Sequence, residues 1–309
     1  MRRLKILDYA AYLALRIFIC IIQATTIETC HRICKTLAWI AHDIFRVRRK
    51  VVDENISHVF PNWSSAQRNQ LALRMWEHLF LMVCELAHIP RKLHETNWRK
   101  YVRVADREAI VGAFLDRRPF IIASGHYGNF EMGAQITGLL GFKTYTLARQ
   151  LDNLYLHRWV NAYRGANGQY TLTSWGASNI VAELLDAGQT IVLLGDQFGG
   201  PKGCWVNFLG RPASYFKSVA LFPLTAKAPM AVIRTRRTGG PMQFEIAAQG
   251  LLDPETDEIG GIKPVIEWYN DRLEEMVGVD PSQYWWLHRR WKGDPAIRRR
   301  RKRTKPKAA

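Results

Sequence analysis

A histidine and a glutamate stand five residues apart in the segment SGHYGNFEMG, residues 124–133. Five helical steps of about 100° would leave His126 and Glu131 about 140° apart on one helix, so they could not face each other there. They can meet if His126 lies in a turn and Glu131 in the first turn of the following helix, and Gly125 and Gly128 give the backbone that freedom. Glu131 would then hold the imidazole in one tautomer and stabilise its charged form, as the partner of a general base does. A histidine that only caps a helix is the alternative.

The elements that must position this pair alternate between strands and helices from residue 118 onward. Two short apolar runs, FIIAS at 120–124 and TIVLLG at 190–195, are typical of buried strands. Further strands are predicted at 144–148, 170–174, 230–235 and 244–248, and helices at 65–88, 129–140, 153–166, 177–187, 215–228 and 262–277. This alternation predicts an α/β fold with a mixed or mostly parallel sheet flanked by helices. Ligands of such folds collect beyond the carboxyl ends of the strands, and both His126 and Asp196 follow such ends.

Other site patterns do not fit the sequence. The spacing does not suit a zinc helix, and we find neither a GxSxG elbow nor a GxxxxGK[ST] phosphate loop, so no metal is expected. The glycine-rich residues 199–203 predict a turn. The five cysteines include no CxxC pair and are predicted to be reduced thiols of a cytosol-facing protein, or simply small buried apolar side chains: Cys20, Cys30, Cys34, Cys84 and Cys204.

The chain is strongly basic. Its formal net charge is +17, and eight of these charges lie in residues 298–307, which leaves an excess of nine on the body. Such a balance favours anionic partners, among them phospholipid head groups, phosphorylated glycolipids, acidic carrier proteins and nucleic acid. A nucleic-acid-binding protein is an alternative of another class, but the sequence contains no recognisable nucleic-acid module, so we expect no nucleic acid.

The N-terminal region contains an apolar stretch, residues 9–27, that is close to the length needed to span a bilayer. Arg16 lies near its middle, and a central arginine disfavours a spanning helix. A cleaved signal peptide is less expected because no clear cleavage site follows. The stretch is therefore predicted to anchor the chain to a membrane, spanning it or lying in its interface, with a buried helix as the alternative. Basic residues on both sides favour a cytoplasmic orientation of the rest of the chain.

Residues 124–133 resemble the His-x4-Glu signature of the late acyltransferases of lipid A biosynthesis, the lauroyl/myristoyl group. Four other segments resemble the same family in the same order: RKVVDENISHVFP (49–61), ARQLDNLYLHRWVNAYRGANG (148–168), LGDQFGGPKGCWVNFLGRP (194–212) and PSQYWWLHRRWK (281–292). The resemblance thus covers most of residues 1–292. Two features depart from the usual pattern, namely the long basic tail and Gln197 after Asp196, where many relatives have Asp-His.

The resemblance implies transfer of a fatty acyl group from an acyl carrier protein or coenzyme A thioester to a hydroxyl of a membrane glycolipid. Glycerophospholipid and mannolipid acceptors are alternatives. The thioester is already activated, so no cofactor is implied. The family's motifs carry over to His126 as general base, Glu131 as its partner, and four substrate-binding residues, Arg164, Asp196, Arg149 and Asn129. From the residues alone, Arg164 could instead complement a helix C-terminus and Asp196 could form a turn.

Three regions follow from these observations. Residues 1–50 are predicted to form a membrane anchor with amphipathic helices, 51–295 an acyltransferase domain, and 296–309 a basic disordered tail. The resemblance also implies a location at the bacterial inner (plasma) membrane, with the catalytic domain facing the cytoplasm. Trp285, Trp286 and Trp291 are expected to be core residues or membrane-interface anchors rather than a platform for substrate.

Overall fold

A computed structural model of the chain describes residues 2–173 and 177–293. Its centre is a seven-stranded sheet in the order β1-β9-β8-β2-β5-β3-β4. Its strands are β1 (Val102–Val104), β2 (Phe120–Ser124), β3 (Thr144–Ala148), β4 (Gln169–Thr173), β5 (Thr190–Leu194), β8 (Met230–Arg237) and β9 (Phe244–Leu252). Among the described residues of this sheet, the β8–β9 pairing is antiparallel and the other pairings are parallel. The predicted α/β fold with a mixed, mostly parallel sheet is therefore confirmed.

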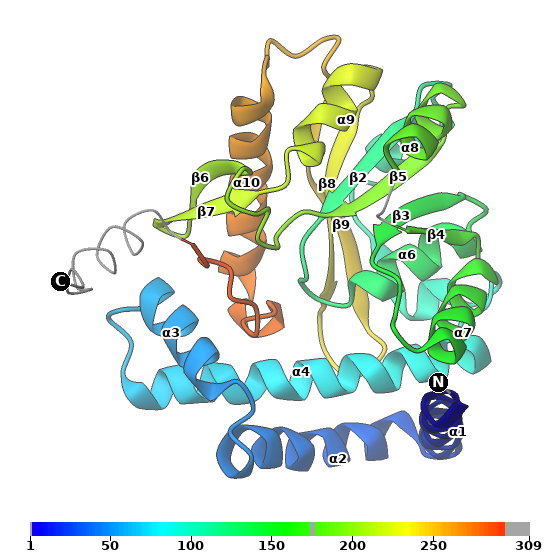
Figure 1. Ribbon diagram of the computed structural model, residues 1–309, viewed down its shortest axis with the longest axis vertical. Coiled ribbons are helices and arrows are strands. Elements are labelled where there is room, and N and C mark those ends of the chain that lie inside the picture. Colours follow the sequence, from blue (N-terminus) through cyan, green and yellow to red (C-terminus); the bar gives the residue numbers. More distant parts are fainter. Residues whose placement is uncertain (1, 174–176, 294–309) are drawn as a thin grey trace.

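Helices cover the sheet and extend below it (Figure 1). They are α1 (Arg2–Ala24), α2 (Ile27–Trp39), α3 (Arg49–Val59), α4 (Ser65–Lys92), α5 (Arg107–Leu115), α6 (Phe130–Leu139), α7 (Leu154–Gly165), α8 (Ala177–Asp186), α9 (Ser218–Ala226) and α10 (Ile262–Val279). Three short helical turns complete the set, at Ile40–Ile44, Trp98–Lys100 and Pro281–Gln283. The structure thus forms every predicted strand and helix within a few residues of its predicted bounds. Ser174, at the end of one predicted strand, lies outside the described residues.

Local sequence accounts for the elements nearest the expected site. All five residues of β2 are buried, as expected of an apolar run in a central strand. Helix α4 begins with a capping box in which Ser64 and Gln67 bond each other's backbone N–H groups.

The antiparallel hairpin of β6 (Cys204–Phe208) and β7 (Arg211–Tyr215) was not predicted, and neither was β1. The glycine-rich residues 199–203 contain the predicted turn, in the connection between β5 and β6, where the Gly203 N–H donates to the Gly200 carbonyl.

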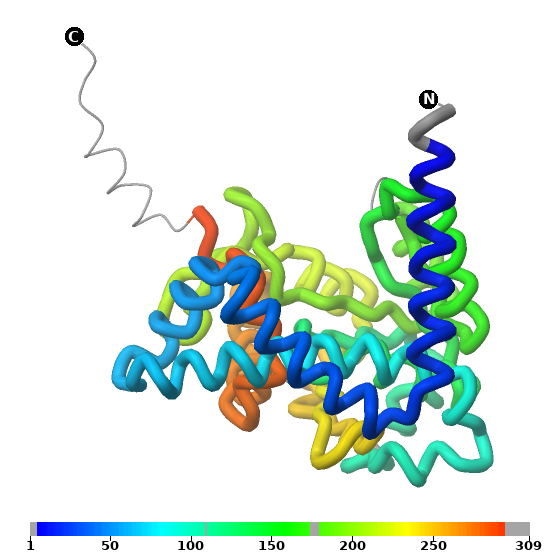
Figure 2. Tube along the Cα trace, turned by 90° about the horizontal axis from the view of Figure 1, so that it is seen from below, coloured from blue at the N-terminus to red at the C-terminus, as the bar shows by residue number. Residues whose placement is uncertain are grey.

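Helix α1 lies along the outside of the molecule, beside α7 (Figure 2). Most of its apolar side chains are exposed, including Ile6, Leu7, Ile17 and Ile21, which the buried-helix alternative does not predict. The guanidinium of Arg16 bonds the Tyr12 hydroxyl and lies over the rings of Tyr12 and of Trp159 on α7. Among the described residues, α1 is the one helix whose length and composition would allow it to cross a membrane.

Helix α2 packs against α4 and brings three cysteines together. Cys30 and Cys34 are buried, and the Cys34 and Cys84 sulfurs lie 3.7 Å apart as free thiols.

The basic tail predicted at 296–309 lies outside the described residues, so its predicted disorder stays a prediction.

Candidate active site

His126 and Asp196 meet at the carboxyl ends of two neighbouring parallel strands. The register of β2 and β5 pairs Ser124 with Leu194, so the residues that follow each strand emerge side by side. Asp196 Oδ1 accepts a hydrogen bond from His126 Nδ1 at 2.7 Å, and its Oδ2 accepts one from the His126 backbone N–H at 2.8 Å. Because Nδ1 donates to the carboxylate, the other ring nitrogen of neutral His126, Nε2, carries an available lone pair.

The two groups shift each other's protonation. Burial disfavours the charged imidazole, but the carboxylate of Asp196 outweighs burial and raises the pKa of His126 above its ordinary value. Burial alone would raise the pKa of Asp196, yet its contacts with His126 hold it below the ordinary range. The carboxylate therefore stays charged while the imidazole can accept a proton, as a general base oriented by an acid requires.

The structure differs from the prediction that Glu131 holds the imidazole of His126. Glu131 lies in the first turn of α6, as expected, but its carboxylate faces α7 and binds Arg164. Arg164 Nε lies 3.1 Å from Glu131 Oε2, and its Nη2 bonds the other carboxylate oxygen. The pairing of β2 with β5 explains this difference. It places Asp196 against Nδ1 of His126, the position that Glu131 was expected to occupy. Glu131 acts on His126 only as a more distant charge.

A large cavity connects these two pairs. It measures about 970 Å³ and borders the last residues of β3 and β5 and the first residues of β4. His126, Gln197 and the Glu131–Arg164 pair supply polar groups to its wall, while apolar side chains line much of the rest: Met82, Leu86, Leu147, Val181, Val192, Leu194, Val219 and Phe222. Arg149 also borders it, with 82% of its side chain exposed, and its ion-pair partner Asp152 is 93% exposed. The cavity can thus hold a long apolar chain beside a polar reacting group.

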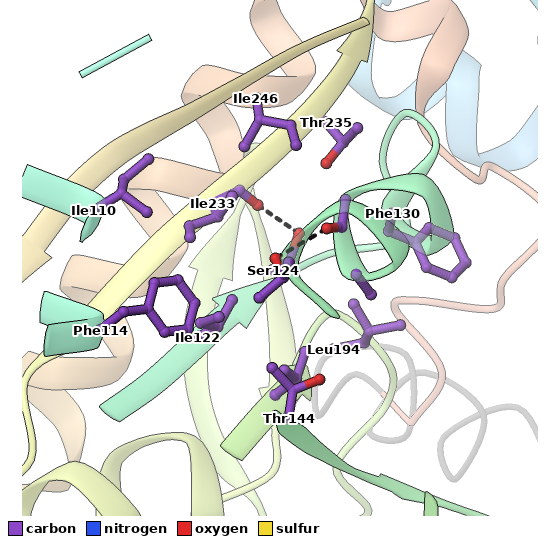
Figure 3. Close-up of a pocket in the computed structure, with 14 residues that line it drawn as sticks. Ile110, Phe114, Ile122, Ser124, Phe130, Thr144, Leu194, Ile233, Thr235 and Ile246 are labelled. Carbon is purple, nitrogen blue, oxygen red and sulfur yellow. Dashed lines mark hydrogen bonds between the residues drawn. The ribbon is translucent and has the colours of Figure 1, made fainter. Parts of the chain in front are cut away.

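A smaller apolar cavity of about 60 Å³ lies under α6, against the sheet. It shares Phe130, Ala134, Val192 and Leu194 with the larger cavity. Figure 3 shows Phe130 and Leu194 on one side of it, and Ile110 and Phe114 on the other. Phe130 also contacts the His126 ring edge to face, with centroids 5.1 Å apart. The side chain of Phe130 therefore stands between His126 and the inner cavity.

Asn129, predicted to bind substrate, is fully buried and does not border the large cavity. Its side chain caps α6 by accepting from the Met132 N–H, and it donates to the buried carboxylate of Glu85 on α4. The position demands an N-cap because the first N–H groups of a helix lack partners within the helix. In this structure Asn129 therefore supports the turn that carries His126.

Helix α4 supports the turn that carries His126 through buried polar contacts that were not predicted from the sequence. Arg237 makes two hydrogen bonds to Glu85 and one to His78 Nδ1, and His78 Nε2 bonds the backbone oxygen of Gly128. Burial holds the pKa of His78 well below its ordinary value, so its ring is neutral and can both donate and accept. The left-handed φ of +60° at Gly128, with the Thr235 carbonyl against it, excludes any larger residue there.

The three tryptophans that were predicted to be core residues or membrane-interface anchors differ in their positions. Trp286 and Trp291 are buried in the core. Trp285 instead borders the large cavity, and its backbone N–H donates to the His126 carbonyl at 3.0 Å. The segment after α10 thereby contributes to the wall of the cavity beside His126.

The chain resembles known proteins along nearly its whole length. It is 20% identical over 264 residues to the lipid A biosynthesis lauroyltransferase of Escherichia coli K12, covering 84% of each chain. It is also 20% identical to the palmitoleoyltransferase of that strain, over 83% of this chain and 82% of the relative. A solved structure, the 1-acyl-sn-glycerophosphate acyltransferase PlsC from Thermotoga maritima, aligns with a TM-score of 0.41 at 10% identity, over 84% of this chain and all of that one. The family model for bacterial lipid A biosynthesis acyltransferases matches residues 1–293, so the resemblance found in the sequence is confirmed, and the chain belongs to this family of acyltransferases.

Proposed function

We propose that the chain transfers a fatty acyl group from the thioester of an acyl carrier protein or coenzyme A to a hydroxyl of a lipid A-type glycolipid, with His126 as general base. The observation that carries this proposal is the position of His126, which borders the cavity while its Nδ1 is held by a buried carboxylate. Asp196, rather than Glu131, is the proposed partner that orients the imidazole.

The reaction follows from this arrangement. The acceptor hydroxyl hydrogen bonds to His126 Nε2, and its oxygen attacks the thioester carbonyl carbon while its proton passes to Nε2. The carbonyl electron pair moves onto oxygen, which becomes the oxyanion of a tetrahedral intermediate. When the carbonyl re-forms, the carbon–sulfur bond breaks and the departing thiolate takes the proton from Nε2. Asp196 stabilises the imidazolium between the two transfers.

The remaining wall of the cavity supports both substrates. The apolar side chains that line it match an acyl chain, whose burial is favourable by about 0.8 kcal/mol per methylene. We propose that Arg164, oriented by Glu131, faces the anionic head group of the acceptor, since a guanidinium suits phosphate and carboxylate groups. Arg149 is proposed as an outer contact because it is exposed at the border of the cavity.

The test of the proposed base is His126→Ala in purified enzyme, with a radiolabelled acyl thioester and a lipid A precursor as acceptor. We expect transfer to fall by about 10² to 10⁴, the range for loss of a general base. His94→Ala, on an exposed side chain after α4, is the matched control and should keep normal turnover. Near-normal transfer by the His126 variant, with its melting temperature unchanged, would refute the proposal.

We further propose that α1 anchors the enzyme to the bacterial inner membrane, with the cavity on the cytoplasmic side. Its exposed apolar side chains and the basic body support this. Deleting residues 1–20 removes most of α1 but keeps Ile22 and Gln23, which contact the folded body. This variant should leave the membrane fraction and bind anionic vesicles only weakly, at low salt. A full-length chain found wholly soluble in a salt-free lysate would contradict the anchor.

A further inference from the structure

Gln197, the residue after Asp196, places its side-chain amide between two imidazoles. Its Nε2 lies 3.3 Å from His126 Nε2 and 3.2 Å from His288 Nε2. Since Nδ1 of neutral His126 donates to Asp196, its Nε2 can only accept, so Gln197 must present an N–H to it. The second N–H of the same amide then points to His288. Gln197 therefore donates to the nitrogen that would take the proton from the acceptor.

The surroundings hold both neighbours of this amide in place. Burial lowers the pKa of His288, which keeps its ring neutral and able to accept. The His288 backbone oxygen accepts from Asn55, and its ring lies 5.1 Å from that of His126. The guanidinium of buried Arg290 donates to the backbone oxygen of Gln197 at 3.4 Å and to that of Ser214 at 2.8 Å. The position of Gln197 is thus fixed at its backbone and at the tip of its side chain.

We propose that Gln197 is a catalytic residue that stabilises the oxyanion of the tetrahedral intermediate; the proposal rests on the function proposed above. The arriving acceptor hydroxyl takes over the lone pair of His126 Nε2 and displaces one N–H of Gln197. His288 keeps the other N–H, so the amide stays beside the reacting atoms. The displaced N–H then faces the thioester carbonyl oxygen, which receives the electron pair and becomes the oxyanion. The amide transfers no proton, and all bonds form and break as in the reaction above.

A donor used in this way stabilises the transition state and not the ground state. Loss of one oxyanion donor typically lowers kcat by about 10² to 10³. The same donor serves when water replaces the acceptor, because hydrolysis of the thioester passes through the same kind of oxyanion. His288 is a positioning residue in this scheme, since it acts only through Gln197. Its removal should therefore cost less than removal of the amide.

The experiment compares Gln197→Ala and Gln197→Glu in the full-length enzyme, scored for acyl transfer and for thioester hydrolysis. We expect kcat to fall about 10²- to 10³-fold for both products, with little change in KM for donor or acceptor. His288→Ala should lower kcat less, and it should add nothing in the Gln197→Ala background. Gln189→Ala, which removes a partly exposed glutamine in the turn before β5, is the matched control and should leave kcat unchanged.

The pH profile separates catalysis from a structural role. Charged or titratable groups near His126 are Asp196, Glu131 and His288. Gln197→Glu would add a carboxylate to this set, raise the pKa of His126 and move the acid limb of kcat to higher pH, whereas Gln197→Ala would not add that charge. The proposal is overturned if folded Gln197→Ala keeps kcat within about threefold of wild type, or loses activity only through KM. Failure of the proposed function is a separate result, because it would show as activity retained in His126→Ala.

Discussion

Two acid–base pairs contribute side chains to the wall of the same cavity, the first through His126 alone, and they differ in how they are built. In the His126–Asp196 pair the side chains are 11% and 0% exposed, and both residues follow adjacent parallel strands. In the Arg164–Glu131 pair they are 24% and 16% exposed, and the residues lie on two different helices, α7 and α6. The first pair is fixed by the sheet, while the second depends on the packing of helices at the border of the cavity.

This difference teaches how similar residue types can serve different steps. A buried carboxylate with two contacts to one histidine can set its tautomer and its pKa, which chemistry at the imidazole requires. A more accessible arginine, held by a carboxylate but open to the cavity, is suited to bind a charged group of a substrate. The predictions below test this division, beginning with the largest expected effect.

Replacing Asp196 by Asn should damage the chemical step most after loss of His126 itself. The amide keeps the shape but cannot accept from both the ring and backbone N–H groups as a charged carboxylate does, so we expect transfer to fall by about 10² to 10⁴. Asp186→Asn, on an exposed residue of α8, is the control. A loss of transfer activity of less than about threefold would contradict the proposal that His126 and Asp196 act as one unit.

The same variant has a pH signature. A general base must be neutral, so activity should rise as pH increases through the pKa of His126. Asp196 raises that pKa, and removing its charge should lower the pKa. The acid limb of the residual activity should therefore move to lower pH in Asp196→Asn. A limb that stays in place, measured on kcat with saturating substrates, would mean that another group controls it.

Replacing Arg164 should affect the acceptor more than the chemistry. We expect Arg164→Ala to lower transfer about 10- to 100-fold, the worth of a charge-assisted hydrogen bond, but to lower thioester hydrolysis far less. Arg164→Lys should remain impaired because it keeps the charge but loses the planar fork of donors. The assay scores both products with and without acceptor.

The control for that variant is the double substitution Arg164→Ala with Glu131→Gln. It removes the carboxylate that Arg164 would otherwise leave unpaired near His126. Equal loss of transfer and hydrolysis in both variants would show that Arg164 serves the chemistry or the fold, and the assignment to the acceptor would be abandoned.

The smallest expected effect concerns the acyl chain. Phe130 stands between the two cavities, so Phe130→Ala should join them and favour longer acyl donors. Each extra buried methylene is worth about 0.8 kcal/mol, or about fourfold in kcat/KM. Competition between acyl thioesters that differ by two carbons would reveal the shift. An unchanged preference would place the end of the acyl chain elsewhere in the cavity.

The sequence predicted the sheet better than the partners within the site. The apolar runs at β2 and β5 mark buried strands without any long-range information, because burial on both faces requires such runs. The partner of His126 could not be read from spacing, since Asp196 is 70 residues away and only the parallel pairing brings it near. The useful signal was that both residues directly follow predicted strands.

The contacts of α4 show a second limit. His78, Glu85 and Arg237 lie on two elements whose relative position no local pattern encodes, yet they hold the turn that carries His126. Asn129 was expected to bind substrate because it lies inside the motif, but it is the N-cap that this turn needs. Motif membership alone therefore does not separate residues that touch a ligand from residues that support those that do.

The most direct test of this division is a pair of double-mutant cycles on acyl transfer, one joining His126→Ala with Asp196→Asn and the other joining His126→Ala with Glu131→Gln. Residues that act as one unit lose little more together than the more damaging change loses alone. We predict that the His126–Asp196 double variant is about as slow as His126→Ala, while adding Glu131→Gln slows His126→Ala further by about its own separate factor. The reverse pattern, with losses that multiply for His126 and Asp196 but not for His126 and Glu131, would contradict the account and return Glu131 to the role of partner.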